Sequence, residues 1–405
     1  MTVDAAEFLD LFDPAVVADP YPHYAALRAV APVAWHSGLG TYVTSTHAAA
    51  FAVLRDRKLG RIFTPKPGAE WDVFNWLHAD SILDSEPPKH TRLRRLVSSA
   101  FTRGHIQRMA PRIVELTAGL LDECAAKLAD GGTFDAIADY AEPLPVLVIA
   151  ELLGAPTADR VLLRDWSQAI VKMYEPGPSA EQLLAAQIAA RDFAGYVEEL
   201  AGHRAAHPGE DLLTALVQAR DGSDRLSPTE LIATAVLLLN AGHEASVNGF
   251  GNGLAALLDH SPALDRVLDN VDDDALIESL VEEMLRFDSP LHLFERTASA
   301  DVEIAGMTVP EGAKIAALLG AANRDPAVFD AADTFDPTRD PNRHIAFGAG
   351  IHFCIGAPLA RLEMQISVRA LLKRFGRLQV DRADQRETFV LRGFHSLLLA
   401  PVVRP

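Results

Sequence analysis

The fold is decided by a glycine-rich stretch near the end of the chain, Phe347-Gly348-Ala349-Gly350-Ile351-His352-Phe353-Cys354-Ile355-Gly356. Glycines bracket a single thiol there, and a helical pattern starts directly after it. Glycine permits backbone conformations and close approaches that side chains forbid. A thiol just before the N-terminus of a helix feels the positive end of the helix dipole, which stabilises a thiolate. The stretch therefore indicates a cysteine that binds a metal or acts as a nucleophile, and zinc is disfavoured because only one histidine lies nearby.

The composition excludes several classes of protein. Among 405 residues there are two cysteines, Cys124 and Cys354, too few for a disulfide framework or for a zinc or iron–sulfur site held by four cysteines. Cys124 is interpreted as structural, because it lies in an ordinary helical pattern, LLDECAAKL. The formal charge of −18 leaves no excess of lysine and arginine for binding nucleic acid or an anionic membrane surface.

The sequence also lacks the patterns of a secretion signal and of a membrane span. Its acidic start has neither a basic region nor an apolar run of the kind that precedes signal cleavage. The most apolar run, residues 231–239, falls far short of the ~20 residues that a span requires. Together with the scarcity of cysteine, this predicts a cytoplasmic protein.

No repeat and no linker divides the chain, and most of it carries helical periodicity. Apolar residues recur at i, i+3 and i+4 from about 88 to 236. Ser227 and Glu230 form the sequence signature of a capping box, which opens a long helix through residue 258. We therefore expect a mainly α fold with minor β, built by residues 1–405 as a single domain. Further helices are expected at 21–30, 274–287 and 358–375, a hairpin within 33–46, strands at 302–309 and 314–319, and irregular segments at 65–84 and 325–357.

The cysteine loop resembles the haem-binding loop of the cytochrome P-450 family, whose pattern is Phe-Gly-x-Gly-x-x-x-Cys-x-Gly. The resemblance runs from about residue 13 to residue 401. It implies the cytochrome P-450 fold of the bacterial soluble type, a helix-rich triangular single domain with small β-sheets. It also implies bound haem b, with the Cys354 thiolate as the axial iron ligand and with Phe347, Gly348 and Gly356 in the loop around the sulfur. Thiolate ligation favours O–O cleavage.

The same resemblance supplies partners for the two haem propionates. His90 and Arg94 are i and i+4 on one helical face and match the family's C-helix. Arg296 matches the family's arginine on the strand after the K-helix, and His344 matches a further propionate donor. Solvated surface charge is the alternative for a basic cluster of this kind.

A glutamate and an arginine, Glu283 and Arg286, lie at i and i+3 and would alone indicate only a surface ion pair. With Arg339 they match the family's Glu-Arg-Arg triad. That triad braces the coil that holds the cysteine loop, so we interpret it as structural.

The long helix contains Ala241-Gly242-His243-Glu244-Ala245-Ser246. In the family the glycine lets this helix approach the haem and opens a groove for O₂, which offsets its helix cost of ~1 kcal/mol. Glu244 fills the family's acid position, but Ala245 stands where the family has a threonine whose hydroxyl orders a water for proton delivery. Ser246 could replace that hydroxyl, although it lies about 100° further round the helix. A substrate hydroxyl or an extra water is the replacement that we favour.

The chain carries no flavin or nicotinamide fingerprint such as GxGxxG. The resemblance therefore implies a separate ferredoxin and an NAD(P)H-dependent ferredoxin reductase. Because ferredoxin and this chain are both acidic, docking requires a local basic patch, and solvated charge is the alternative for each candidate. The candidates flank the C-helix and the cysteine loop: Arg92, Arg95, Arg103 and Arg361.

Substrate contacts transfer from the family by position only. The density of Trp and Phe indicates a compact lipophilic or aromatic substrate. Asn240 and His292 stand out as hydrogen-bonding groups, although packing inside the protein is an equal alternative. The full set of expected contacts is Trp71, Phe74, Trp76, Met173, Leu237, Asn240, Ala241, Leu291, His292, Leu293 and Phe394.

These features predict a monomeric haem-thiolate monooxygenase. It would insert one oxygen atom from O₂ into a small organic substrate by hydroxylation, epoxidation or O-demethylation. Two alternatives stay open. One is a haem-thiolate peroxygenase or isomerase that needs no external reduction, and the other is a non-catalytic haem protein that binds a small ligand.

Overall fold

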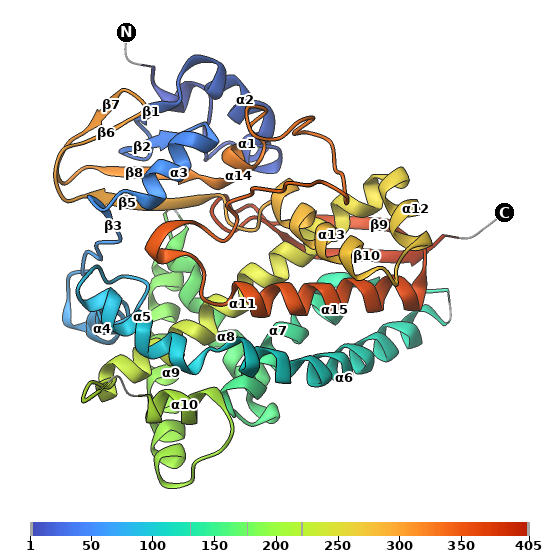
Figure 1. Ribbon diagram of the computed structural model, residues 1–405, viewed down its shortest axis with the longest axis horizontal. Helices are drawn as coiled ribbons and strands as arrows, with labels where there is room; N and C mark the ends of the chain where they lie inside the picture. Colours follow the sequence, from blue (N-terminus) through green and yellow to red (C-terminus); the bar gives the residue numbers. More distant parts are fainter. Residues whose placement is uncertain (1–2, 130, 176, 220–221, 403–405) are drawn as a thin grey trace.

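The computed structural model describes residues 3–129, 131–175, 177–219 and 222–402. Most strands gather at the upper left of the molecule, β9 and β10 lie on the right beside α12 and α13, and helices fill the rest, so that the outline tapers toward α10 (Leu212–Gln218) (Figure 1). The two described ends of the chain lie far apart at the surface. This arrangement confirms a mainly α fold with small sheets.

The helices supply most of the core. In chain order the others are α1 (Pro14–Ala18), α2 (Tyr21–Val30), α3 (His47–Arg55), α4 (Asp72–Ala79), α5 (Lys89–Ala100), α6 (Arg103–Leu128), α7 (Pro143–Leu153), α8 (Arg160–Val171), α9 (Ala180–Ala206), α11 (Pro228–Asp259), α12 (Ser261–Asp269), α13 (Asp274–Phe287), α14 (Leu319–Asn323) and α15 (Ala357–Phe375). Within the described ranges, no helix is both long and apolar enough to cross a membrane.

Three small sheets complete the fold. The largest has the order β1-β2-β8-β5-β3, in which β2 and β8 run parallel and the other neighbours antiparallel. The second has the order β4-β10-β9, and β6 pairs with β7. The strands are β1 (Val33–His36), β2 (Thr41–Thr44), β3 (Leu59–Gly60), β4 (Phe134–Asp135), β5 (Leu293–Ala298), β6 (Val302–Ile304), β7 (Met307–Val309), β8 (Lys314–Leu318), β9 (Leu378–Gln385) and β10 (Phe394–Pro401).

Helix α11 runs through the centre of the helical part, packed by α4, α7, α8, α9 and α13. Its N-terminus has the predicted capping box: the Ser227 hydroxyl accepts the Glu230 N–H, and the Ser227 N–H donates to the Glu230 carboxylate at 2.9 Å. Side chains are buried around most of its circumference, which explains its high apolar content. The helix therefore offers a rigid frame for any group that it carries.

The Glu-Arg-Arg triad is assembled as predicted. Arg286 donates to both oxygens of Glu283, at 2.7 and 2.8 Å, and Arg339 donates to the same carboxylate at 3.1 Å. The two arginines also donate to backbone carbonyls between residues 323 and 334, and Glu283 accepts the Asp336 N–H at 2.8 Å. The irregular coil before the cysteine loop is thus fixed by one buried ion cluster, without regular secondary structure.

One expectation about secondary structure was wrong. Residues 65–84 are not wholly irregular, because they contain α4. Trp71, Phe74 and Leu77 are buried in the main core from this segment. The burial of one apolar face therefore allows a helix to form in this segment, despite the prolines and the glycine at the start of the segment.

Candidate functional site

The Cys354 loop has the tight geometry that its glycines predict. The Cys354 N–H donates to the Phe347 carbonyl at 3.0 Å, which closes the loop just before α15. Gly350 has φ 73°, and a Cβ there would lie 2.4 Å from the Leu54 carbonyl oxygen of α3. Only glycine fits this position, so the loop backbone is pressed against α3 and holds the thiol in place.

The two cysteines differ in their surroundings. Cys124 is fully buried, and desolvation raises the pKa of its thiol to about 12. Cys354 has an exposed side chain. Desolvation also raises the pKa of its thiol, against the N–H groups of Gly356 and Ala357 and the charge of Arg94, which lower it. The helix N-terminus therefore lowers the pKa of the Cys354 thiol, as predicted, but desolvation raises it by more. Direct coordination to a metal would deprotonate the thiol outright.

Buried basic groups surround the cysteine loop. The Arg94 guanidinium is close enough to Cys354 to interact with it electrostatically, and desolvation lowers its pKa. Arg296 is 3% exposed and donates only to the carbonyl of its neighbour Glu295, and desolvation lowers its pKa to about 9. The His90 Nε2 is buried without a hydrogen-bond partner among the described residues. Glu86 lies close enough to His90 and Arg296 to interact with them, but none of the three basic groups forms an ion pair with a carboxylate of the described residues. The cluster therefore fits an anionic ligand with more than one acidic group.

His344 does not belong to this cluster, contrary to expectation. Its Nε2 bonds to the Glu282 carboxylate at 2.9 Å, and its Nδ1 accepts the Ala346 N–H at 3.2 Å. Both ring nitrogens are therefore committed within the protein. The sequence analysis missed His352, whose ring lies 4.4 Å from that of His90 but whose Nε2 bonds to the Glu86 carboxylate at 2.8 Å, so that this histidine is paired within the protein as His344 is. In the sequence, this histidine could have been noticed from its position two residues before Cys354.

On α11, the acid at position 244 is held by an ion pair. Glu244 is 2% exposed and accepts a hydrogen bond from Arg386 Nη1 at 2.7 Å. Arg386 also donates to the Phe394 carbonyl, so the pair ties α11 to the turn between β9 and β10. His243 is buried beside Glu244 with neither ring nitrogen hydrogen-bonded in the described structure, and desolvation lowers its pKa to about 4.

The neighbouring positions on α11 differ from one another in role. Ala245 and Ser246 are partly exposed, and the described residues provide no hydrogen-bond partner for the Ser246 hydroxyl. At Gly242 a Cβ would lie 2.4 Å from Ile149 Cδ1, which gives this glycine a packing role that the sequence analysis did not foresee. This glycine allows α11 to pack closely against α7. Asn248, one turn after Glu244, was missed by the sequence analysis, and both of its side-chain polar atoms are buried without described partners.

Three of the expected substrate contacts meet at one cavity. A cavity of about 20 Å³ is lined by Phe74 of α4, Ile170 of α8, Ala190 of α9, and Leu237 and Asn240 of α11, among others. Leu237, Ala241 and Ala245 follow one another at i, i+4 and i+8, on one face of the helix. Ala241 is exposed although most of α11 is buried. The cavity and this face together mark the side of α11 on which a substrate would lie.

The remaining expected contacts are dispersed. Trp71 is buried beside Phe74, while Trp76, Met173 and Phe394 are partly buried against the main core. Leu291 forms an isolated bridge with Leu391, and Leu293 begins β5 against the N-terminal core cluster. Of this group, the Trp76 indole N–H is buried without a described partner. No shared cavity brings these side chains together in the described structure.

His292 was wrong as a substrate contact. Its side chain is fully buried, and its Nδ1 bonds to the Tyr24 hydroxyl at 2.8 Å. Tyr21 and Phe389 pack against the ring, and Asp288 lies 3.8 Å from Nε2. The histidine therefore links α2 to the segment after α13, which is a structural role.

The candidate basic patch is largely neutralised. Arg361 donates to both oxygens of Glu282, at 2.6 and 2.8 Å, and its guanidinium lies over the Phe347 ring. Arg92 pairs with Glu230 and Asp224. Arg95 is exposed, and the side chain of Arg103 lies outside the described residues. At least two of the four arginines thus already have acidic partners within the chain.

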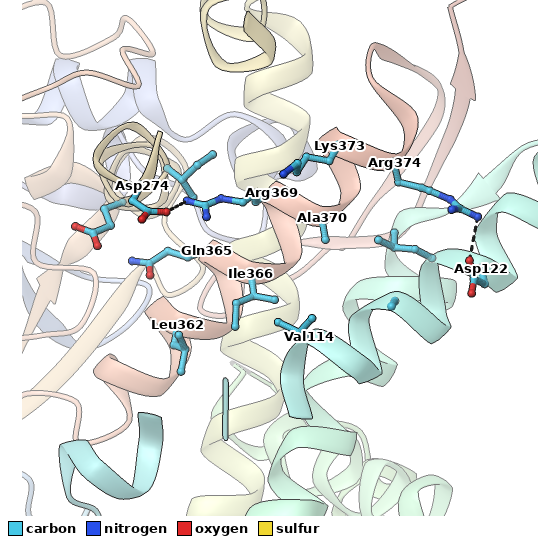
Figure 2. Close-up of a pocket in the computed structure, with 14 residues that line it drawn as sticks. Val114, Asp122, Asp274, Leu362, Gln365, Ile366, Arg369, Ala370, Lys373 and Arg374 are labelled. Atoms are coloured by element: carbon cyan, nitrogen blue, oxygen red, sulfur yellow. Dashed lines mark hydrogen bonds and ion pairs between the residues drawn. The ribbon is translucent and has the colours of Figure 1, made fainter. Parts of the chain in front are cut away.

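A larger hollow lies elsewhere, between α6, α13 and α15 (Figure 2). Its volume is about 660 Å³, and Leu362, Ile366 and Ala370 of α15 run along it. Ion pairs from α15 cross its rim, Arg369 to Asp274 and Arg374 to Asp122. None of the expected site residues lines this hollow.

The geometry defines a class of protein before any comparison. Across the described ranges, no three His, Cys, Asp or Glu side chains form a metal-binding group. A metal bound by Cys354 therefore needs its other ligands from outside the chain, and the buried cations call for acidic groups on the same ligand. An iron macrocycle with carboxylate substituents meets both requirements, which is the chemistry of a haem-thiolate protein.

Comparison with known proteins agrees with this class. The sequence profile of the family "Cytochrome P450" matches residues 174–402. The biotin biosynthesis cytochrome P450 of Bacillus subtilis (strain 168) is 37% identical over 389 residues, covering 95% of this chain and 96% of that protein. The 6-deoxyerythronolide B hydroxylase of Saccharopolyspora erythraea is 39% identical over 397 residues, covering 94% and 95%.

Solved structures of cytochromes P450 are also similar to this chain. The crystal structure of P450BioI with an acyl carrier protein ligated to hexadec-9Z-enoic acid has a TM-score of 0.90 and 34% identity, and the match covers 96% of this chain and 99% of that one. The chain belongs to the cytochrome P450 family and is a P450 monooxygenase. Its cofactor is haem b, with a cysteine thiolate as iron ligand, and Cys354 is the cysteine whose loop fits that role.

Replacing Arg296 by methionine should change haem affinity and the stability of the haem-free protein in opposite directions. The haem-free protein should become more stable, because an unpaired buried charge is removed. Haem should bind roughly ten- to a hundredfold more weakly, because a charge-assisted hydrogen bond is lost. Thermal unfolding of the haem-free protein and haem transfer to apomyoglobin measure the two effects. Arg382→Met, at an exposed position on β9, is the control, and unchanged haem transfer from Arg296→Met would contradict the assignment.

Proposed function

We propose that this P450 acts on a small lipophilic or aromatic substrate, and that residues 1–405 work as a single cytoplasmic domain and as a monomer. Electrons come from a separate ferredoxin with its NAD(P)H-dependent reductase. The observation that supports the substrate class is the mostly apolar lining of the small cavity beside α11, which would enclose one part of the substrate: Phe74, Leu77, Ile170, Ala190, Ala233, Val236 and Leu237. Apolar walls with few polar groups are typical of sites for such ligands.

The residues of the chain have distinct tasks. Haem bound through Cys354 supplies the activation of O₂. Arg94, Arg296 and His90 hold its acidic groups, and the glycine loop fixes the sulfur. Glu244, anchored by Arg386, is the acid nearest to the position where the family's threonine is missing. The reaction oxidises the substrate by one oxygen atom and reduces the other to water, with two electrons from the donor and two protons.

Proton delivery needs a replacement for the missing hydroxyl beside Ala245. We favour an extra water or a substrate hydroxyl over Ser246. Asn248 supports the water, because both of its side-chain polar atoms are buried without partners in the described structure. Buried waters characteristically satisfy such groups. Asn248 lies three residues after Ala245, about 60° round the helix from it.

A reconstituted assay tests this function. Purified protein with a ferredoxin, its reductase and NADPH should oxidise lipophilic substrates, and its reduced, CO-bound spectrum should show thiolate ligation. Turnover with hydrogen peroxide but none with ferredoxin and NADPH would favour a peroxygenase. A thiolate spectrum without product under either condition would favour a ligand-binding protein.

Replacing Ala245 by threonine should raise coupling severalfold for substrates that lack a hydroxyl group. The added hydroxyl would order the water that delivers protons, so that less hydrogen peroxide is released per NADPH consumed. Product, peroxide and NADPH are measured together. An unchanged product-to-NADPH ratio would refute the water or substrate-hydroxyl replacement. A drop in coupling in Ser246→Ala would instead assign the relay to that serine.

A further inference from the structure

The side-chain amide of Asn240 is buried, and its oxygen already accepts a hydrogen bond. Its side chain is on α11, and the residue is 4% exposed. The Ser167 hydroxyl of α8 donates to Asn240 Oδ1 at 2.8 Å. Ser167 is itself 2% exposed, so the bond joins two buried polar side chains across the packed face of α8 and α11. The bond fixes the direction in which the amide points.

The other half of the amide is free. In the described part of the chain, no group accepts a hydrogen bond from Asn240 Nδ2, although the residue lines the cavity of about 20 Å³. Two other polar residues that line the cavity have partners of their own. Asp84 accepts from the Arg61 guanidinium at 2.9 Å, and the Ser81 hydroxyl donates to the His78 carbonyl at 3.0 Å. The Asn240 amide therefore presents its donor hydrogens to the cavity without an acceptor among the described residues.

The size of the cavity sets what can enter it. A buried water needs at least ~10–15 Å³, so about 20 Å³ accommodates one polar atom rather than a whole substrate. The remaining lining is mostly apolar and includes Phe74 and Leu237. An unpaired donor in such surroundings discriminates strongly, because a ligand without an acceptor leaves it buried and unsatisfied.

We propose that Asn240 recognises a hydrogen-bond acceptor on the substrate, and that Ser167 is the positioning residue that orients it. The proposal rests on the proposed function and narrows its substrate class to lipophilic molecules that carry a carbonyl, ether or hydroxyl oxygen. Asn240 precedes Ala245 by five residues, roughly 8 Å along the helix axis. The acceptor therefore lies several bonds away from the carbon that is oxidised.

Matched ligands test the proposal on the haem-loaded protein. Cyclohexyl phenyl ketone is compared with its methylene isostere, in which CH₂ replaces the carbonyl oxygen. The Kd of each is read from the low- to high-spin shift of the haem. The wild type should bind the ketone roughly three- to tenfold more tightly, the effect of one hydrogen bond. Asn240→Leu should abolish this preference while keeping affinity for the isostere, and Ser167→Ala should reduce it.

Val236→Ala is the matched control, because Val236 lines the same cavity without a polar group. It should shift both Kd values together and leave their ratio unchanged. Equal Kd values in the wild type, or a preference that survives Asn240→Leu, would overturn the proposal. If Asn240→Leu fails to retain haem, an unaltered ratio in Ser167→Ala overturns it instead. A thiolate spectrum recorded for every variant separates this failure from failure of the proposed function.

Discussion

Replacing Glu283 by glutamine is expected to lower the free energy of unfolding by about 3–5 kcal/mol, the cost of breaking a buried ion pair from one side. Glu283 and Arg286 are both 0% exposed. Each Glu283 oxygen accepts several hydrogen bonds, from Arg286, Arg339, the Asp336 N–H and Asn342. A carboxamide would turn a donor group toward these donors and leave the Arg286 charge uncompensated.

The loss should extend to the haem site, because the same cluster holds the coil that leads to the cysteine loop. Chemical unfolding monitored by circular dichroism measures the stability, and the reduced, CO-bound spectrum measures the fraction with thiolate ligation. Glu278→Gln is the matched control, since Glu278 lies on the same helix and is exposed. It should change stability by no more than about 0.5 kcal/mol. Equal stability of the two variants would show that the ion cluster does not hold the coil.

Local signals were enough to predict much of this molecule. The glycine pattern around Cys354 and the capping box at Ser227 depend on residues close in sequence, and both appear in the structure as predicted. Helices with sustained periodicity were placed to within about one residue, as for α13 at Asp274–Phe287. Such features are determined by backbone geometry and by neighbours within one or two turns.

The errors all involve partners that are distant in the sequence. His344 is paired with Glu282, 62 positions away, and His292 with Tyr24, 268 positions away. A single sequence states that a histidine or glycine is present but not which side chain faces it. Tertiary packing decides whether a polar residue is committed within the protein or free for a ligand.

The predicted basic patch is largely neutralised for the same reason, because its arginines pair with acidic residues that are distant in the sequence. This pairing affects the expected docking of the electron donor. Arg92 and Arg361 have acidic partners supplied by α11 and α13, so their charge is largely cancelled locally. With a formal charge of −18, the whole molecule repels an acidic partner at long range. Association with the proposed ferredoxin should therefore become faster as ionic strength rises.

Burial without a partner also affects one carboxyl group, Glu363, that the sequence analysis did not single out. Glu363 lies on α15 and is 6% exposed, and it has no hydrogen bond or ion pair with any described residue. Desolvation raises the pKa of its carboxyl to about 8. Glu363 is therefore largely protonated in the folded protein at neutral pH but ionised in the unfolded chain. Folded and unfolded states thus bind different numbers of protons over the pH range between these two pKa values.

Replacing Glu363 by glutamine is consequently expected to stabilise the protein at pH 7 by about 3 kcal/mol and to flatten its pH dependence. The wild type has its full stability below the unfolded pKa of 4.5 and loses about 1.4 kcal/mol per pH unit as the pH rises toward 8. Glutamine cannot ionise, so the variant avoids this loss and the two proteins converge near pH 4. Unfolding free energies at several pH values between 4 and 9 measure the difference, with the exposed Glu303→Gln as control. Parallel pH profiles for wild type and Glu363→Gln would show that the carboxyl is already ionised in the folded state and is stabilised there by a partner.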